Sequence, residues 1–454
     1  MEDVLLGRIL TAMTLGFHIL YATVGVGIPI VIMVLEFLGI KRNDYHYLTM
    51  ARRIAKGYTV TVAVGVVTGT IIGLQLSLIW PDFMRLAGHI IALPLFMETF
   101  AFFFEAIFLG IYLYTWDRFK NRWNHWLLTI PVVIGSSLSA VFITTVNSFM
   151  NTPAGFKLTD GVFKNIDPIA AMLNPSSGVR VFHVVMTAYM TAAFIMVTIA
   201  AFKLLRAKFK EDIEYHKKGL KVSMIIGLSA AALTLLAGDL SAKFLHNEQP
   251  EKLAAFEWHF ETEENADLIL FGILDEENQE VKGALRVPSA LSILSGFKPS
   301  TEVVGLNDIP EDEWPPLVVH YFFDIMVTFG MFGLGISALY FVLRFFKKEW
   351  AHSRFMLYLY ALSGPLCFAA IEAGWFTAEM GRQPWIIRGY MRVTEAVTQA
   401  DGLGITLIMF GVLYLILAYT TIQVMTNMFK HTSAHTSQIE YYGKESLMEQ
   451  GGRF

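Results

Sequence analysis

The chain has 454 residues, of which 54% are hydrophobic and only 16% are charged, and its formal net charge is −4. Soluble domains carry about 25% charged residues, so this composition indicates an integral membrane protein. The small net charge argues against a nucleic-acid partner. The single cysteine, Cys367, excludes a disulfide framework and any cysteine-ligated zinc or iron–sulfur site built by this chain alone.

Nine apolar stretches are long enough to cross a bilayer, since a crossing helix needs about 20 mostly apolar residues. In chain order they are 9–37, 54–79, 93–116, 124–148, 179–205, 219–241, 317–343, 354–376 and 402–428. The opening segment MEDVLLGRIL has neither a basic region nor a cleavage site, so we expect the first stretch to be a retained span. The predicted fold class is an all-α integral membrane protein with nine transmembrane helices.

Lysine and arginine residues gather in every second connection between the spans. The basic connections lie near residues 41–56, 118–122, 203–221 and 344–354. The positive-inside rule places them in the cytoplasm, with the N-terminus outside and the C-terminus inside. The predicted organisation is helices one to six in 1–242, a long external loop in 243–316, helices seven to nine in 317–430, and a cytoplasmic tail in 431–454.

The external connection is long and acidic, and contains HFETEENADLILFG and NDIPEDEWPP. A structureless insertion of this length is usually functional or disordered. Lys252 and Glu257, five residues apart within it, could hydrogen-bond a quinol headgroup and accept its proton. Taken alone, the segment is more typical of a solvated amphipathic helix.

Four residues that could bind iron fall in the outer half of the predicted bilayer: His18, His183, Met326 and Glu379. Taken singly, an intramembrane histidine is often a helix–helix hydrogen bonder, a methionine usually packs, and Glu379 could pair with Arg382. A shared depth favours a haem layer. Histidine with methionine is a low-spin haem ligand pair, whereas a single or weak axial ligand leaves a coordination position open for O₂.

Two carboxylates, Glu98 and Glu105, lie seven residues apart in the third span and therefore on one helical face. Burying both costs several kcal/mol unless they are protonated or paired. They form either a structural hydrogen-bond pair or a proton relay. Ser139 and Asn147, eight apart on one face of the fourth span, would alone indicate only helix packing.

Three motifs together resemble subunit I of the cytochrome bd quinol oxidases, from Arg8 to about residue 428. The most specific is GRQPW at 381–385, preceded by Trp375 and Glu379. The others are KLAAFEWHFET at 252–262 and PLFMETFAFFFE at 94–105.

This resemblance implies haem cofactors held by the four candidate iron ligands. His183 and Met326 match the ligands of a low-spin haem b. His18 and Glu379 match those of two high-spin haems, one b and one d, or a third haem b in place of d; which residue holds which is left open.

The remaining site residues also follow from the resemblance. Glu98, Glu105 and Ser139 match a proton route beside the di-haem centre. Lys252 and Glu257 match the quinol-site pair. The cofactor-binding set is completed by Arg8 and Arg382, placed for haem propionates, and by Trp375, which packs one turn before Glu379.

The resemblance implies a terminal oxidase in the bacterial cell membrane. It would oxidise menaquinol or ubiquinol at the outer face and reduce O₂ to water, generating a proton motive force without pumping. The partners implied are a second membrane subunit, the quinone pool and O₂, with room for a small single-span subunit. Two features depart from the best-known members: Asp324 replaces an arginine two residues before Met326, and the external loop is of the short, Gram-positive type.

Two other functions fit part of the pattern. One is a haem-free proton-coupled transporter that uses Glu98, Glu105 and Glu379, although the chain shows no internal repeat. The other is a di-haem electron carrier with a different terminal acceptor, which would leave Glu379 unexplained.

Overall fold

The computed structural model describes residues 2–159, 161–206, 210–398, 401–430 and 432–443. Within these ranges it has nine helices long and apolar enough to cross a membrane, which confirms the predicted fold class. They are α1 (Glu2–Arg42), α2 (Tyr45–Ile79), α3 (Pro81–Tyr114), α5 (Thr129–Asn151), α7 (Ser177–Arg206), α8 (Ile213–Glu248), α11 (Val319–Phe346), α12 (Arg354–Met380) and α14 (Leu403–Lys430).

Several helices extend beyond the predicted spans. Helix α1 has 41 residues and α8 has 36, so at about 1.5 Å per residue both exceed the hydrocarbon thickness of a bilayer. Helix α12 continues to Met380, and Glu379 therefore lies in its last turn. The sequence had placed Glu379 just after the end of this helix.

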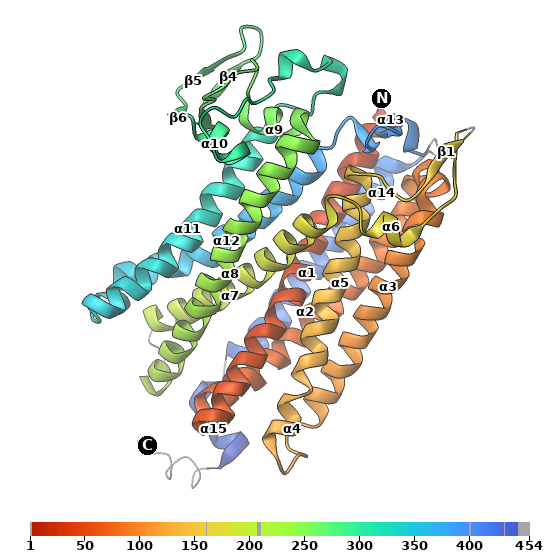
Figure 1. Ribbon diagram of the computed structural model, residues 1–454. Coiled ribbons are helices and arrows are strands. Elements are labelled where there is room, and N and C mark those ends of the chain that lie inside the picture. The colour runs from red at the N-terminus through yellow and green to blue at the C-terminus, as the bar shows by residue number, and fades with distance from the viewer. Residues whose placement is uncertain (1, 160, 207–209, 399–400, 431, 444–454) are drawn as a thin grey trace.

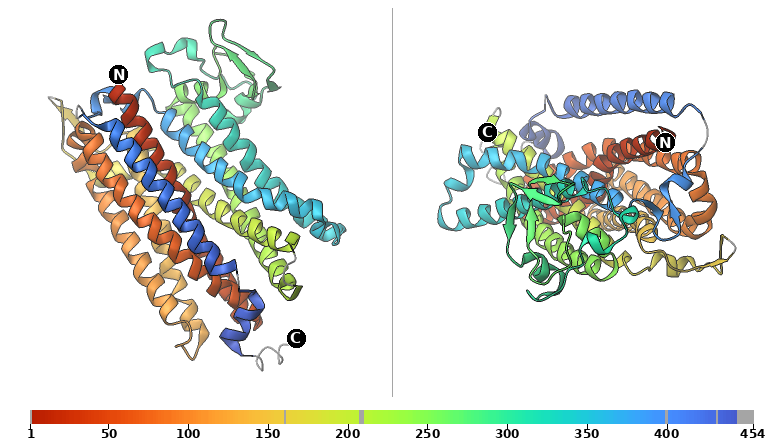
Figure 2. Two further views of the ribbon diagram at one scale, coloured as in Figure 1. Left: turned by 180° about the vertical axis from the view of Figure 1, so that it is seen from behind. Right: turned by 90° about the horizontal axis from the view of Figure 1, so that it is seen from above.

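The long helices form two groups joined by α1 and α7 (Figure 1). In the first group α1 packs against α2, α5 and α14, and α3 packs against α5. In the second, α7 packs against α8 and α12, and α11 packs against α12 and α8. Helix α14 lies along the flank of the first group and buries little of its surface (Figure 2).

Prolines inside the helices free backbone carbonyls, and side chains of neighbouring helices bind them. Pro29 removes the amide that would bind the carbonyl of Gly25, and the Tyr58 hydroxyl on α2 donates to this carbonyl at 2.7 Å. Pro365 likewise frees the carbonyl of Ala361, to which the Thr198 hydroxyl on α7 donates at 3.1 Å. In lipid these contacts matter, because no water can satisfy the backbone.

A folded cap covers the end of the bundle that carries the N-terminus, here called the cap end (Figure 1). The cap contains α9 (Pro250–Glu257), β3 (Leu268–Leu270), β4 (Ile273–Asp275), β5 (Glu280–Lys282), β6 (Leu285–Val287) and α10 (Ala290–Gly296), followed by two 3₁₀ turns, Leu306–Asp308 and Glu311–Glu313. Strand β3 pairs with β6 and β4 with β5, both antiparallel, which makes one nested hairpin. Buried Trp258, Phe260 and Leu306 form its core, so the long connection is an ordered structure.

Six shorter elements complete the cap end. They are β1 (Lys157–Thr159), β2 (Val162–Lys164), α6 (Pro168–Met172), the β7–β8 pair (Trp385–Ile387 and Met391–Arg392) and α13 (Val393–Ala396).

The opposite end, here called the tail end, carries α4 (Arg122–Trp126), α15 (Ala434–Tyr442) and the 3₁₀ turns Lys210–Asp212 and Trp350–His352. The Asp212 carboxylate accepts the amides of Ala434 and His435 at 2.8 and 2.9 Å and so caps α15. Part of the predicted tail, His431 and 444–454, lies outside the described residues.

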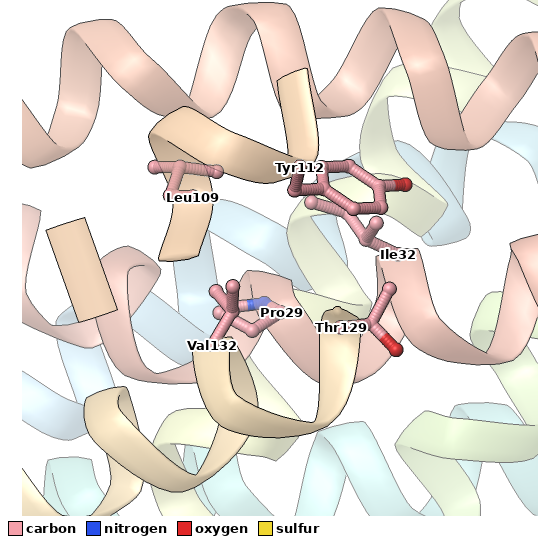
Figure 3. Close-up of a pocket in the computed structure, with 6 residues that line it drawn as sticks. All are labelled: Pro29, Ile32, Leu109, Tyr112, Thr129 and Val132. Carbon is pink, nitrogen blue, oxygen red and sulfur yellow. The ribbon is translucent and has the colours of Figure 1, made fainter. Parts of the chain in front are cut away.

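One small cavity lies between α1, α3 and α5 beside Pro29 (Figure 3). Its lining is almost wholly apolar, and its volume of about 10 Å³ is at the lower limit for one water molecule. We interpret it as a packing defect next to the proline.

The orientation of the bundle can be tested with two cysteine variants. Lys282→Cys lies in the cap, and Lys347→Cys lies in the basic connection after α11; both native side chains are exposed. In intact cells a membrane-impermeant maleimide is expected to label Lys282→Cys and not Lys347→Cys, because the positive-inside rule puts the cap outside. The native Cys367 is buried and gives little background. Labelling only at position 347 in intact cells would reverse the orientation.

Candidate haem and quinol sites

His183 on α7 and Met326 on α11 lie at the same level of the bundle. Farther from the cap end, a Cβ atom on Gly333 of α11 would lie only 2.6 Å from Cε of Met190 on α7, so the two helices touch there. His183 is seven residues before Met190, and Met326 is seven before Gly333. A seven-residue step returns to nearly the same helical face about 10 Å away, and both helices run from the cap end. Both side chains therefore lie about two turns from that contact, toward the cap end.

Glycines of two neighbouring helices lie against this pair. A Cβ on Gly374 of α12 would lie 3.0 Å from the Met326 sulfur, and one on Gly238 of α8 would lie 3.9 Å from His183 Cε1. Nδ1 of His183 is buried without a hydrogen-bond partner among the described residues. An imidazole with an unpartnered ring nitrogen and a thioether are donor types that suit a low-spin haem iron.

His18 is held at the interface of α1 with α2. Its Nδ1 lies 2.8 Å from the hydroxyl of buried Thr68, which fixes the ring and leaves Nε2 for a metal. A Cβ on the adjacent Gly69 would lie 3.3 Å from His18 Cε1, so glycine keeps this side of the ring open.

Glu379 is held by both of its oxygens. Asn147 Nδ2 on α5 donates to Oε1 at 2.5 Å, and Arg382 Nη2 donates to Oε2 at 2.5 Å. The pairing with Arg382 that the sequence suggested is therefore present, together with an amide partner.

Glu379 and His18 lie at different depths. Gly16 on α1 lies beside Glu372 on α12, which gives a common level for the two helices. Glu379 is seven residues from Glu372, toward the cap end. His18 is two residues from Gly16, away from the cap end. Glu379 and His18 are thus separated by roughly 14 Å along the helix axes. This distance is too long for both to bind one iron, so each suits a separate iron.

Glu372 itself was missed by the sequence reasoning. It lies seven residues before Glu379 on the same face of α12, and its Oε1 is buried without a hydrogen-bond partner among the described residues. The signal was present, because an acidic residue in the middle of a predicted span is rare and usually functional.

Arg8, Arg180 and Arg382 are all already engaged. Arg8 donates to the side chain of Gln383, and Arg180 donates from Nη1 to Asn147 Oδ1 at 3.3 Å. Arg382 also donates from Nη1 to the carbonyls of Trp385 and Ile386. Nε of Arg382 and Nε of Arg180 are buried without partners in the described part of the chain. These two Nε groups, rather than the whole Arg382 guanidinium, are free to reach an anionic group. Trp375 is half-buried one turn before Glu379.

The carboxylates of α3 each have a hydroxyl partner. Ser139 on α5 donates to Glu98 at 3.0 Å. Glu105 is buried and bonds to the Tyr58 hydroxyl, which also lies 2.7 Å from the Gly25 carbonyl. Because Tyr58 has one hydroxyl proton for two acceptors, a protonated Glu105 that donates to Tyr58 satisfies all three groups.

Lys252 is almost wholly enclosed, at 2% exposure, so α9 is not a solvated amphipathic helix. Its ammonium group donates to Asn151 Oδ1 at the end of α5, at 2.6 Å. Burial, and then the nearby positive charges of Arg180 and Arg382, lower the pKa of Lys252 well below its usual value.

Glu257 is fully buried on a different side of α9, since a five-residue step turns about 140° around a helix. Burial, and then the charge of Asp324 on α11, raise the pKa of Glu257 to about 8; only the Ile269 amide acts in the opposite direction. Neither carboxylate oxygen forms a hydrogen bond of normal geometry with the described residues. The structure therefore does not join Lys252 and Glu257 directly, but places them on two sides of one short helix.

Asp324, the departure noted in the sequence, anchors the cap. It accepts the Phe271 amide at 2.5 Å, and His320 Nε2 lies 3.3 Å from the same oxygen. His320 stacks on Trp258, next to Glu257, with ring centroids 3.9 Å apart. An arginine here would bring a positive charge to this acidic environment, whereas Asp324 ties helix α11 to the β3–β4 turn.

The donors are dispersed. Within the described residues, no three His, Cys, Asp or Glu side chains converge as a metal cluster would require. A haem iron takes only one or two protein ligands, because the macrocycle supplies the rest, so isolated donors fit haem.

Comparison with known proteins gives one family. Residues 6–433 match the profile described as cytochrome bd terminal oxidase subunit I. A Bacillus subtilis protein named cytochrome bd menaquinol oxidase subunit I is 40% identical, over 95% of this chain and 97% of its own. A second B. subtilis protein, cytochrome bd ubiquinol oxidase subunit 1, is 32% identical over 96% and 95%.

The fold agrees with a solved structure. The bd oxidase from Geobacillus thermodenitrificans superposes with a TM-score of 0.91 at 55% identity, covering 95% of this chain and 99% of that one. With a profile match over nearly its whole length and these relatives, the chain belongs to the cytochrome bd terminal oxidase subunit I family.

Proposed function

We propose that this chain is the haem-carrying subunit of a terminal oxidase that oxidises quinol at the cap end and reduces O₂ to water. The observation that carries the proposal is the placement of His183 and Met326 at one level of α7 and α11, each against a glycine of a neighbouring helix. A proton-coupled transporter would need neither residue, and family membership already gives a quinol oxidase.

His183 and Met326 would hold a low-spin haem b. His18 and Glu379 would each face one of two high-spin haems, a b and either a d or a further b. When bound, these haems supply electron transfer and an open iron position for O₂. Arg180 and Arg382 present buried Nε groups suited to propionates, and Trp375 packs beside Glu379.

Lys252 and Glu257 would take the quinol headgroup. Glu257, when deprotonated, can accept a proton and release it on the cap side. Glu98 with Ser139 and Glu105 with Tyr58 would hold protons arriving from the tail end. Release and uptake on opposite sides would build a proton motive force without a pump.

The quinol is menaquinol or ubiquinol, since the two B. subtilis relatives are named for one each. The complex would contain a second membrane subunit, with room for a small single-span subunit. The apolar outer face of α14, with Ile405, Ile408 and Leu415 exposed, is available to such a neighbour or to lipid.

The proposed function is tested on the complex purified after co-expression with its second subunit. Spectra of the reduced form with and without CO should show a low-spin haem and a CO-binding haem, and quinol should drive O₂ uptake. Absence of haem would exclude the oxidase. Low-spin haem without CO binding or O₂ uptake would instead identify an electron carrier.

Replacing the predicted methionine ligand should remove one spectral class only. In Met326→Leu the low-spin haem signal is expected to be lost or to become high-spin, while CO binding at the His18 and Glu379 sites remains, because these lie on other helices. Quinol-driven O₂ uptake should fall at least tenfold. Met331→Leu, an exposed methionine on the same helix, is the matched control. An unchanged low-spin spectrum in Met326→Leu would remove Met326 from the ligand set.

The Glu257 carboxyl should set a pH dependence of quinol oxidation. Its raised pKa of about 8 keeps it protonated at neutral pH, and only the deprotonated form can accept a proton. The value of kcat/KM for quinol is therefore expected to rise as the pH approaches about 8 and then level off. Glu257→Gln should lower activity and abolish this rise, whereas the exposed Glu264→Gln should keep it. A rise that persists in Glu257→Gln would assign the titration to another group.

A further inference from the structure

The last turn of α5 carries a residue that the proposed mechanism has not used. Asn151 is buried, with 1% exposure, and each of its polar groups is engaged. Its Oδ1 accepts from Lys252 Nζ at 2.6 Å, its Nδ2 donates to the carbonyl of Asn147 at 2.9 Å, and its own carbonyl accepts from Gln249 Nε2 at 3.1 Å. No other hydrogen bond to the Lys252 side chain is found in the described part of the chain.

The neighbours of Asn151 make this turn rigid. Thr152 donates to Asn174 Oδ1 at 2.7 Å, and Asn174 donates to the Ser148 hydroxyl at 2.8 Å. Ser148 also bonds to Ser177, the first residue of α7, at 2.8 Å. All four are buried. The end of α5 is therefore fixed to the start of the helix that carries His183.

The same turn reaches Glu379. Asn147, one turn before Asn151, donates to the Glu379 carboxylate and accepts from Arg180 at 3.3 Å. A continuous set of contacts thus runs from Lys252 through Asn151 and Asn147 to Glu379. Both intermediates are amides, which neither take up nor release protons near neutral pH. The contacts fix geometry and offer no protonatable group between the two ends.

From this geometry we propose that Asn151 is a positioning residue for quinol oxidation, which holds the Lys252 amine at the quinol headgroup through its side-chain oxygen acceptor. The inference rests on the proposed function, in which Lys252 binds quinol. What matters for this role is an oxygen acceptor at position 151, since Asn151 is the hydrogen-bond partner of the amine among the described residues.

The test uses the two-subunit complex with three variants. Asn151→Ala removes the acceptor. Asn151→Asp keeps the acceptor but loses the Nδ2 donor to Asn147. Asn247→Ala, an exposed asparagine near the end of α8, is the matched control. Haem spectra establish that each complex is assembled, and initial rates give KM for a short-chain quinol and kcat separately.

The proposal expects Asn151→Ala to raise KM for quinol by about tenfold, the loss of one hydrogen bond to the amine, with a smaller change in kcat. Asn151→Asp should keep KM within about threefold of the wild type when assayed at the same pH, and Asn247→Ala should be unchanged. O₂ uptake driven by an artificial reductant that bypasses quinol should stay at the wild-type rate in all variants.

Several results would overturn the proposal. One is an unchanged KM in an assembled Asn151→Ala complex. Another is a rise of KM in Asn151→Asp equal to that in Asn151→Ala. Such a result would mean that the Nδ2 donor to Asn147, and not the oxygen acceptor for Lys252, is what matters. If Asn151→Ala does not assemble, KM of Asn151→Asp alone tests the proposal. A wild-type complex that binds haem and fails to oxidise quinol would overturn the proposed function and this inference together, whereas the variant results alone overturn only the inference.

Discussion

Ionisable side chains inside a bilayer must be paired or neutral, and this constraint is met mainly at the cap end of the bundle. Lys252, Glu379, Arg180 and Arg382 are close enough there for their charges to influence one another. Two amides one turn apart, Asn147 and Asn151, bind the acid and the amine at either end of this group. The packing of α5 against α7, and the attachment of α9 to α5 through Lys252, depend on this arrangement because an unpaired charge here would cost several kcal/mol.

The interior of the bundle follows the related rule that backbone groups cannot stay unpaired in lipid. Pro29 breaks one hydrogen bond in α1, and the Tyr58 hydroxyl that repairs it is the same group that contacts Glu105. The Tyr58 hydroxyl thus serves both the free Gly25 carbonyl and the buried Glu105 carboxyl group. Glycines serve close packing instead, since His18, His183 and Met326 lie against Gly69, Gly238 and Gly374 of neighbouring helices.

The cap explains how a short amphipathic segment becomes a buried site. Helix α9 has Lys252 on the side of α5 and α12 and Glu257 on the side of α11, so it is covered from both directions. Asp324 fastens the β3–β4 turn to α11 above Glu257. The resulting burial raises the pKa of Glu257 and lowers that of Lys252, which would suit the proton exchange proposed for them.

The sequence by itself determined the fold class and most of the candidate donors. The number of hydrophobic runs of about 20 residues predicts the number of transmembrane helices. Polar residues within these runs are easily recognised, because placing them in a bilayer costs free energy and they are therefore rare. The three motifs, of which the one that follows Trp375 and Glu379 is the most specific, indicated the family because the residues of each lie close together along the chain. Contacts between residues far apart in the chain could not be read in this way. Only the tertiary structure showed that α12 includes Glu379 and that α9 is buried. It also decided that Lys252 and Glu257 point to different sides, and that Asn151 and Glu372 belong near the site. The physical reason is that burial and hydrogen-bond pairing depend on which helices pack together, and helical periodicity fixes the face of a residue but not its neighbour.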